Sequence, residues 1–264
     1  MTKIGVVIPA RNEEKNIGQT LDCLLKQTRK PDMIVVVDDG STDKTAEIVG
    51  SFGVHVIRLA NRGYNAVGRP VLAEVSNSGF RFLDEVGGFD YIMKLDAEQL
   101  LLNDYIEKII SRMEKDDRIV VSSGVVAGEF SRSPRGSGRV YRFKFLRDIG
   151  FLPVNYGWDG YPVAKALTMG YKVDVFRDLV TFGQRSTKLS ALKLYFCGKG
   201  MKALGYDPIY LLWECFLKFF KSPKGALNIL RGYLSMDVKK YSDLNIGVWQ
   251  RKNLFKRLLT KMHL

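Results

Sequence analysis

The 264-residue sequence predicts an α/β fold in which a mostly parallel central sheet is flanked by helices and followed by a C-terminal helical extension. Short apolar runs rich in β-branched residues alternate with segments of helical periodicity over the first two thirds of the chain, which is typical of βαβ units. Near residue 188 the strand-like runs stop and only helical segments follow. The sequence therefore predicts two domains, residues 1–188 and 189–264.

The first half of the chain shows this alternation most clearly. Residues 4–10, IGVVIPA, are a short apolar run that predicts a buried strand. Residues 12–27 carry apolar side chains at helical spacing. Because strands joined by crossover helices run parallel, we expect a parallel arrangement here. The further elements expected up to residue 126 are helices at 43–48, 65–83 and 101–115, and strands at 33–42, 54–60, 89–97 and 118–126.

The second half of the chain is less regular. Residues 131–139, SRSPRGSGR, have no periodicity and predict a loop. A short helix at 161–170 and a strand at 171–176 come next. The remaining segment predicts helices, with breaks at 205–208 and 222–223, where residues that favour turns gather.

The positive charge is concentrated at the C-terminal end of the chain. Residues 1–185 hold 26 Lys/Arg and 24 Asp/Glu, whereas residues 186–264 hold 15 and 4, a net charge of +11 out of +13 for the whole chain. Such a basic block indicates an anionic partner, either a nucleic acid or a membrane surface.

An apolar segment lies within this basic block. Residues 209–220, IYLLWECFLKFF, are too few to span a bilayer. Their wide apolar face, with Trp213 and Phe216 among neighbouring lysines, predicts a helix lying in a membrane interface. A helical cap on the core or a dimer interface would explain the same pattern. The chain has no run of 18 apolar residues, and its three cysteines show no pairing pattern, so we expect a reduced cytoplasmic location.

Acidic residues follow two of the predicted strands. Asp38 and Asp39 come after the second strand, and Asp96 and Glu98 after the fourth. Ligands of open parallel sheets bind beyond the carboxyl ends of the strands. Carboxylates gathered there repel one another unless a cation or ligand donor groups lie between them, and Mg²⁺ and Mn²⁺ prefer such oxygen ligands.

The motifs VIPARNEE, VDDGSTD and LDAE, in this order, resemble the family-2 inverting glycosyltransferases of the GT-A fold over roughly residues 3–185. The resemblance implies a nucleotide-sugar donor and Mg²⁺ or Mn²⁺ as cofactor. It implies that Asp39 contacts the base or ribose of the nucleotide. The residues implied to line the same pocket are Pro9, Arg11, Glu13 and Arg69.

The resemblance also assigns residues to the metal, the diphosphate and the acceptor. Asp96-Ala97-Glu98 matches the Asp-X-Asp metal motif, which makes Glu98 the metal ligand and Asp96 a contact to the ribose or the metal. Arg185 would hold the diphosphate. Asp159, in the GWDG stretch, matches the general base that takes the proton of the attacking hydroxyl. Each acid also has a structural explanation: Glu98 as a first-turn helix acid, and Asp159 as a turn residue between two glycines.

The predicted function is a metal-dependent inverting glycosyltransferase that acts on a hydroxyl or phosphate acceptor, glycan or lipid-linked. It would be peripheral on the inner face of the cell membrane and would not bind nucleic acid, and a homo-oligomer is an option that the sequence leaves open. Alternatives are a sugar-nucleotide pyrophosphorylase-like enzyme and a non-catalytic protein that binds membrane or nucleic acid. The first would need a glycine-rich loop where this chain has PARNEE, and the nucleic-acid reading rests on charge alone.

Overall fold

The computed structural model describes residues 2–129, 131, 133–185, 190–220 and 222–253, which form two compact units. The first unit comprises Met1–Val67, Val71–Leu152 and Tyr171–Thr187. The second comprises Gly68–Pro70, Pro153–Gly170 and Lys188–Leu264. The second unit thus includes residues 68–70 and 153–170, which were predicted to belong to the first domain. The division into domains 1–188 and 189–264 stays a prediction.

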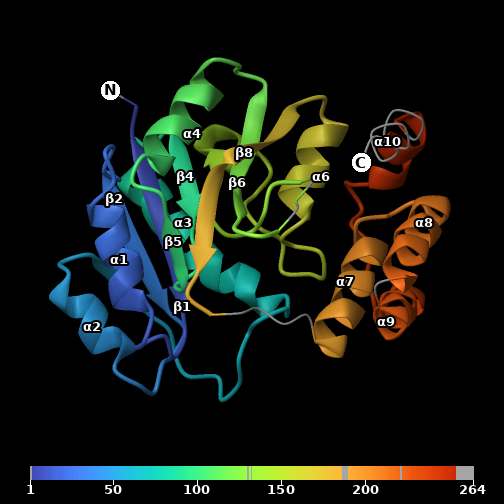
Figure 1. Ribbon diagram of the computed structural model, residues 1–264, viewed down its shortest axis with the longest axis horizontal. Helices are drawn as coiled ribbons and strands as arrows, with labels where there is room; N and C mark the ends of the chain where they lie inside the picture. Colours follow the sequence, from blue (N-terminus) through green and yellow to red (C-terminus); the bar gives the residue numbers. More distant parts are fainter. Residues whose placement is uncertain (1, 130, 132, 186–189, 221, 254–264) are drawn as a thin grey trace. The chain divides into compact units, whose positions relative to one another are not determined.

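The first unit is built on one mixed sheet (Figure 1) with the strand order β3-β2-β1-β4-β7-β6-β8-β5. The four strands β3, β2, β1 and β4 run parallel, and β7 then pairs antiparallel with β4 and β6. This arrangement confirms the predicted α/β fold with its mostly parallel sheet. The strands are β1 (Ile4–Ala10), β2 (Met33–Asp38), β3 (His55–Arg58), β4 (Tyr91–Lys94), β5 (Gln99–Leu101), β6 (Ile119–Val126), β7 (Arg139–Arg142) and β8 (Lys172–Gly183).

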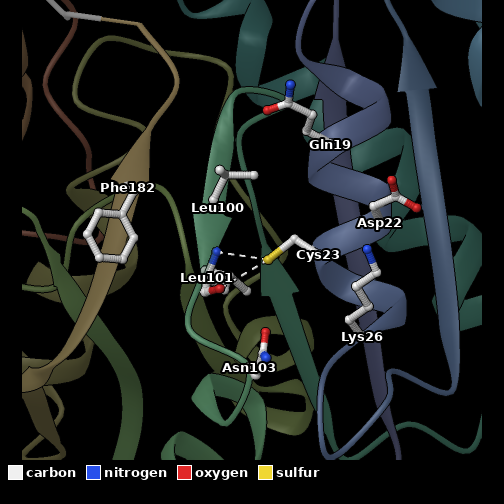
Figure 2. Close-up of a pocket in the computed structure, with 8 residues that line it drawn as sticks. All are labelled: Gln19, Asp22, Cys23, Lys26, Leu100, Leu101, Asn103 and Phe182. Carbon is white, nitrogen blue, oxygen red and sulfur yellow. Dashed lines mark hydrogen bonds between the residues drawn. The ribbon is translucent and has the colours of Figure 1, made fainter.

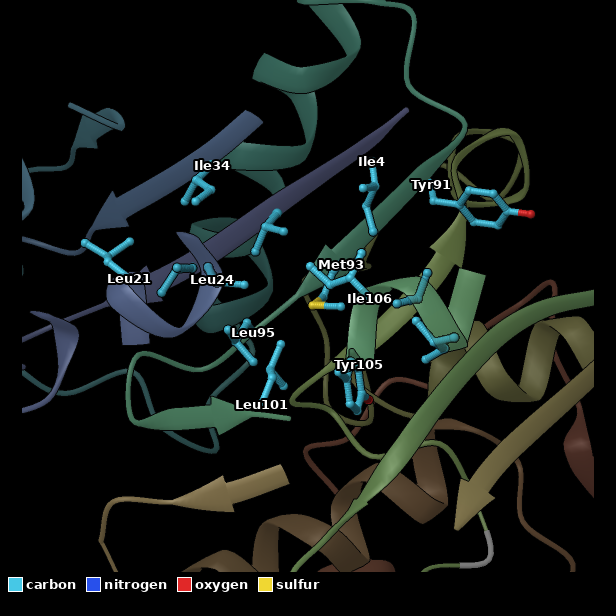
Figure 3. Packing of buried hydrophobic residues seen from close by; sticks show 14 of the residues in the cluster. Ile4, Leu21, Leu24, Ile34, Tyr91, Met93, Leu95, Leu101, Tyr105 and Ile106 are labelled. Carbon is cyan, nitrogen blue, oxygen red and sulfur yellow. The ribbon is translucent and has the colours of Figure 1, made fainter. Parts of the chain in front are cut away.

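Helices cover both faces of this sheet because successive side chains of a strand point to opposite faces. On one face, Ile4, Val6 and Ile8 of β1 belong to a buried cluster with α1 (Ile17–Leu25) and α4 (Tyr105–Glu114), shown in Figure 3. On the other face, Val7 lies against Gly79 of α3 (Val71–Val86). Fully burying one such aliphatic side chain stabilises a fold by about 1.5–3 kcal/mol. The unit also contains α2 (Thr45–Ser51) and α5 (Phe143–Asp148).

Three short elements of the first unit were absent from the sequence prediction. β5 has three residues and lies where a helix was expected to begin, whereas β7 and α5 follow directly after the predicted loop. β7 is a strand because β4 and β6 pair with it on either side. β8 runs seven residues past the predicted end at 176, because its last residues pair with β5 and β6. Pairing partners distant in sequence leave no local signal.

The second unit is helical. Each of the four helices described between residues 191 and 252 begins at a side chain that accepts a hydrogen bond from a backbone N–H of the first turn: Ser190, Asp207, Ser222 and Asn245. Proline follows the cap in two of them, as expected at a position whose N–H is unpaired. The breaks predicted at 205–208 and 222–223 are confirmed. The helices are α6 (Tyr161–Thr168), α7 (Ala191–Ala203), α8 (Pro208–Phe219), α9 (Pro223–Leu234) and α10 (Ile246–Lys252).

Glycines allow α7 and α9 to touch along their backbones. A Cβ atom added to Gly198 of α7 would lie 2.0 Å from the carbonyl oxygen of Ile229, and one added to Gly232 of α9 would lie 2.0 Å from that of Tyr195. Contacts this short exclude any side chain at either position. Leu194, Leu211 and Ile229 pack beside this crossing as the buried core of the three helices α7, α8 and α9.

We predict that Gly198→Ala lowers the free energy of unfolding by about 1–3 kcal/mol, because the added methyl group forces the two helices apart. Gly50→Ala, in α2, is the matched control. No atom of the described residues lies within 4 Å of a Cβ at that position, so the higher helix propensity of alanine should raise stability by up to about 1 kcal/mol. Urea unfolding followed by circular dichroism measures both, and equal stability of the two variants would contradict the packing account.

Candidate functional site

The candidate site of the first unit lies at the carboxyl ends of the adjacent strands β2, β1 and β4. The loop after β1 and the loop after β2 are joined by hydrogen bonds. The side-chain oxygen of Asn12 accepts from the Thr42 N–H at 2.9 Å, and the Asn12 N–H donates to Ser41 Oγ at 3.0 Å. The Glu13 N–H donates to Thr45 Oγ1 at 2.7 Å. The polar residues of the motifs ARNEE and DGSTDKT thus serve first to fix each other.

Arg11 holds the backbone beside Asp39. Its guanidinium donates to the carbonyl oxygens of Asp39 and Gly40, and to the Asn61 side chain at 2.7 Å. Gly40 has φ +67, and a Cβ there would lie 2.4 Å from Cα of Asn61, so the turn requires glycine. The Asp39 carboxylate is therefore presented by a firmly held loop.

Asp39 is a buried carboxylate with spare capacity to accept hydrogen bonds. Its Oδ1 lies 2.5 Å from Nη2 of Arg62, an ion pair not aligned as a hydrogen bond. No hydrogen bond reaches Oδ1 from the part of the chain that the structure describes. Burial raises the pKa of Asp39, and the positive charges of Arg62 and Arg11 oppose that rise. A buried acceptor of this kind suits an N–H or O–H donor of a ligand.

Asp96 follows β4 and is held by a buried lysine. Nζ of Lys94 lies 2.6 Å from Oδ1 of Asp96, and the Asp96 N–H donates to Ser137 Oγ at 3.0 Å. Desolvation works to raise the pKa of Asp96, but Lys94, Ser137 and the buried Arg139 outweigh it, so the pKa lies below its usual value. Asp96 is thus an ionised carboxylate with a fixed counter-ion.

Glu98 and Glu13 share one arginine. Nη2 of Arg185 pairs with the Glu98 carboxylate and also donates to Oε1 of Glu13 at 2.7 Å. Nη1 of Arg185 donates to Oε2 of Glu13 at 3.3 Å. Burial raises the pKa of Glu98, with Asp96 and Glu13 acting in the same direction and Arg185 opposing them. The predicted metal ligand and the predicted diphosphate ligand therefore form an ion pair with each other.

The backbone around Glu98 is anchored independently of this ion pair. The Gln184 N–H donates to the Glu98 carbonyl at 2.9 Å, and its side-chain amide donates to the Asn16 carbonyl and to Thr20 Oγ1. Thr20 in turn donates to the Ala97 carbonyl at 2.8 Å. Helix α1 and the end of β8 thus fix the Asp96-Ala97-Glu98 turn.

The other predicted site residues fall into two groups. Pro9 belongs to the first unit, near the carboxyl end of β1 and next to Val37 of β2. Arg69 and Asp159 belong to the second unit. Arg69 is exposed in the segment before α3, and Asp159 is half-buried in the turn between Gly157 and Gly160 that leads into α6. The roles of all these residues stay predictions.

Lys94 was not among the residues predicted for the site, but it contacts Asp96 directly. The sequence already indicated this contact, because Lys94 and Asp96 are two positions apart and such side chains share one face of an extended chain. Arg62 and Arg139 were also not identified. Arg139 is opposite Lys94 in the β4–β7 register, a pairing that no local pattern encodes.

The donor set fits a hard divalent cation that is shared with a ligand. Across the described part of the chain, no three His, Cys, Asp or Glu side chains converge as a metal cage. Asp96 and Glu98 nevertheless offer carboxylate oxygens one residue apart. Mg²⁺ commonly binds through one or two carboxylates, with phosphate oxygens and water completing its coordination.

A pocket of about 400 Å³ lies between α1 and β5 (Figure 2), but it is not lined by any predicted site residue. Sγ of Cys23 lies 3.1 Å from both the N and the O of Leu101 there, and burial raises the pKa of the thiol. A high pKa makes a thiol a poor nucleophile. The residues around it are Gln19, Asp22, Cys23, Lys26, Leu100, Leu101, Asn103 and Phe182.

The family model "Glycosyl transferase family 2" matches residues 5–180. Glycosyltransferase GlyG of Streptococcus pneumoniae is 28% identical over 151 residues, which cover 55% of this chain and 45% of that protein. A 4,4'-diaponeurosporenoate glycosyltransferase of Staphylococcus aureus is 46% identical over 58 residues, 22% of this chain and 15% of that protein. The chain thus spans less than half the length of these curated relatives.

Solved structures share the fold. The mannosyltransferase PcManGT of Pyrobaculum calidifontis, in complex with GDP-Man and Mn²⁺, has a TM-score of 0.61 at 17% identity, over 89% of this chain and 70% of that one. TarS of S. aureus, in complex with UDP, has a TM-score of 0.56 at 20% identity, over 76% and 64%. Identities this low are evidence for the common fold alone.

Proposed function

Because the chain belongs to glycosyl transferase family 2, we propose that it transfers a sugar from a nucleotide-sugar donor to a hydroxyl or phosphate acceptor, with inversion at the anomeric carbon. The observation that carries this proposal is the group of buried or half-buried carboxylates at the ends of three adjacent strands. One of them, Asp39, has an acceptor oxygen that no described residue hydrogen-bonds. The alternative of a pyrophosphorylase-like enzyme has no observation in its favour.

The donor nucleotide would bind at the end of β2. Asp39 would accept a hydrogen bond from an N–H of the base or a hydroxyl of the ribose, with Pro9 and Glu13 beside it. Arg11 supports this role by fixing the backbone of Asp39 and Gly40. Arg69 remains a further candidate contact. The GDP-Man and UDP complexes of the structural neighbours are consistent with such a donor.

Mg²⁺ or Mn²⁺ would be held by Glu98, with Asp96 as a contact to the metal or the ribose. When bound, the ion compensates the charge that develops on the departing diphosphate. Arg185 would contact the same diphosphate as a second positive charge. The Mn²⁺ named in the mannosyltransferase complex supports this cofactor.

Transfer itself would need one base and no covalent intermediate. Asp159 would take the proton of the acceptor hydroxyl as that oxygen attacks the anomeric carbon and the bond to the diphosphate breaks. For a phosphate acceptor the attacking oxygen is already ionised, so that transfer would need no base. Asp159 lies in the turn that leads into α6, next to its N-cap residue Gly160.

We predict that one nucleoside diphosphate, UDP or GDP, raises the melting temperature of the protein in the presence of Mn²⁺ and less in its absence. Glu98→Ala should reduce the metal-dependent part of the shift. Asp159→Asn should keep the whole shift but lose sugar transfer. Thermal shift with each nucleotide measures binding. Sugar transfer is measured as release of the nucleoside diphosphate from its sugar donor when a cell extract supplies the acceptor.

Two results would count against the proposal. If neither nucleotide stabilises the protein with or without Mn²⁺, the donor site is wrong. If Asp159→Asn loses nucleotide binding, the base has been misassigned. Asp22→Asn serves as the control, because Asp22 is an exposed carboxylate on α1 outside the candidate site.

The acceptor would be presented at an anionic membrane surface. Helix α8 and its C-cap residue Phe220 expose a stripe of large apolar side chains at helical spacing, in which Ile209 is 65% and Phe220 73% exposed. Lys224 and Arg231 are exposed on the following helix. Within the described ranges no helix is long and apolar enough to cross a membrane. An apolar stripe within a segment of net charge +11 matches a negatively charged lipid surface, to which each nearby Lys/Arg contributes roughly 1 kcal/mol.

We predict that the protein co-sediments with vesicles containing phosphatidylserine or phosphatidylglycerol, and that Phe216→Ser/Phe220→Ser reduces the bound fraction several-fold by removing inserted apolar area. The control Leu25→Ser/Val86→Ser changes two exposed apolar residues of the first unit and should bind normally. Equal binding of both double variants would contradict the membrane role. A concentration-dependent dimer that only the α8 variant loses would instead identify this stripe as an oligomer interface.

A further inference from the structure

Arg185 is the shared counter-ion of two carboxylates that are much less exposed than the arginine itself. The side chains of Glu13 and Glu98 are 8% and 14% exposed, whereas that of Arg185 is 50% exposed. The guanidinium therefore covers the two acids from the solvent side. Two shielded carboxylates without a cation between them would repel each other and lack solvation, so some positive charge is required at this position.

The neighbouring carboxylate has a different kind of partner. Asp96 pairs with Lys94, whose side chain is only 4% exposed. A lysine packed in this way keeps its ammonium group in place. Of the two acids of the Asp-Ala-Glu turn, Glu98 is therefore the one whose counter-ion can be exchanged.

The chain around Arg185 would allow this exchange without unfolding. The preceding residue is anchored to Asn16, Thr20 and Glu98 by its side-chain and backbone hydrogen bonds. Only the side chain of Arg185 needs to turn for its guanidinium to leave Glu98. Its second hydrogen bond to Glu13, through Nη1, does not involve Glu98.

We propose that Arg185 occupies, in the ligand-free protein, the place on Glu98 that a divalent cation takes when the donor diphosphate binds. The inference rests on the proposed function and adds that tight binding of the cation depends on binding of the donor diphosphate. The cation alone competes poorly with an arginine already seated on Glu98. A diphosphate offers Arg185 new anionic partners, so cation and nucleotide bind together and Arg185 moves from the carboxylate to the phosphates.

The experiment measures Mn²⁺ binding directly, by loss of the electron paramagnetic resonance signal of free Mn²⁺, with and without UDP or GDP. Wild-type protein should bind Mn²⁺ weakly alone and more tightly with the nucleotide. Arg185→Gln should bind Mn²⁺ alone about tenfold more tightly, the value expected when a competing charged hydrogen bond is removed. The nucleotide should then raise the Mn²⁺ affinity by a smaller factor than in wild type, because its phosphates still ligate the cation but no arginine has to leave Glu98.

Two further variants complete the test. Arg185→Lys keeps the positive charge and should bind Mn²⁺ alone as weakly as wild type. Arg112→Gln removes another partly exposed arginine that is ion-paired to a carboxylate, Asp178, and should behave as wild type. If Arg185→Gln is too unstable to measure, Glu13→Gln/Arg185→Gln carries one shielded carboxylate fewer and should show the same tightened Mn²⁺ binding.

Unchanged or weaker Mn²⁺ binding by folded Arg185→Gln, or by the double variant in its place, would overturn the inference. This outcome differs from failure of the proposed function itself. In that case wild-type protein would bind neither nucleotide in the presence of Mn²⁺.

Discussion

Charge compensation at the carboxyl ends of β2, β1 and β4 is the constraint on which this site depends. Carboxylates shielded from water are tolerated only where a cation or hydrogen-bond donor faces them. Arg62 faces Asp39, Lys94 faces Asp96, and Arg185 faces both Glu13 and Glu98. Removing Arg62 or Arg185 would leave a shielded negative charge. Removing Lys94 would take the fixed counter-ion from Asp96, whose own side chain is 42% exposed.

The partners differ in how firmly they are held, and this difference links the fold to the proposed chemistry. Lys94 is part of a strand and packed within the protein, whereas Arg185 lies just past the end of β8 and is half exposed. The rigid pair keeps the turn after β4 in shape, and the exposed pair gives a ligand access to one carboxylate. The loops after β1 and β2 add a second fixed surface, because their polar side chains bond mainly to each other.

The sequence predicted what is encoded locally. The parallel strands, the helical segments and the acids at strand ends all follow from periodicity and motif, because the residues that decide them are close in sequence. It did not predict β5, β7 or the partners Arg62 and Arg139, which depend on pairings between distant segments. Lys94 is a different case, since its spacing of two residues from Asp96 already indicated that both side chains lie on one face of the strand.

The proposed chemistry requires a nucleoside diphosphate and a divalent cation to bind together at these carboxylates. A crystal structure of the protein with Mn²⁺ and the more strongly stabilising of UDP and GDP, with Mn²⁺ located by its anomalous scattering, tests this requirement. We expect the manganese about 2.0–2.3 Å from a Glu98 oxygen, within the range of hard-cation coordination, the base or ribose at Asp39, and Arg185 turned from Glu98 to the phosphates. Manganese bound away from Glu98, or a nucleotide bound away from Asp39, would contradict it.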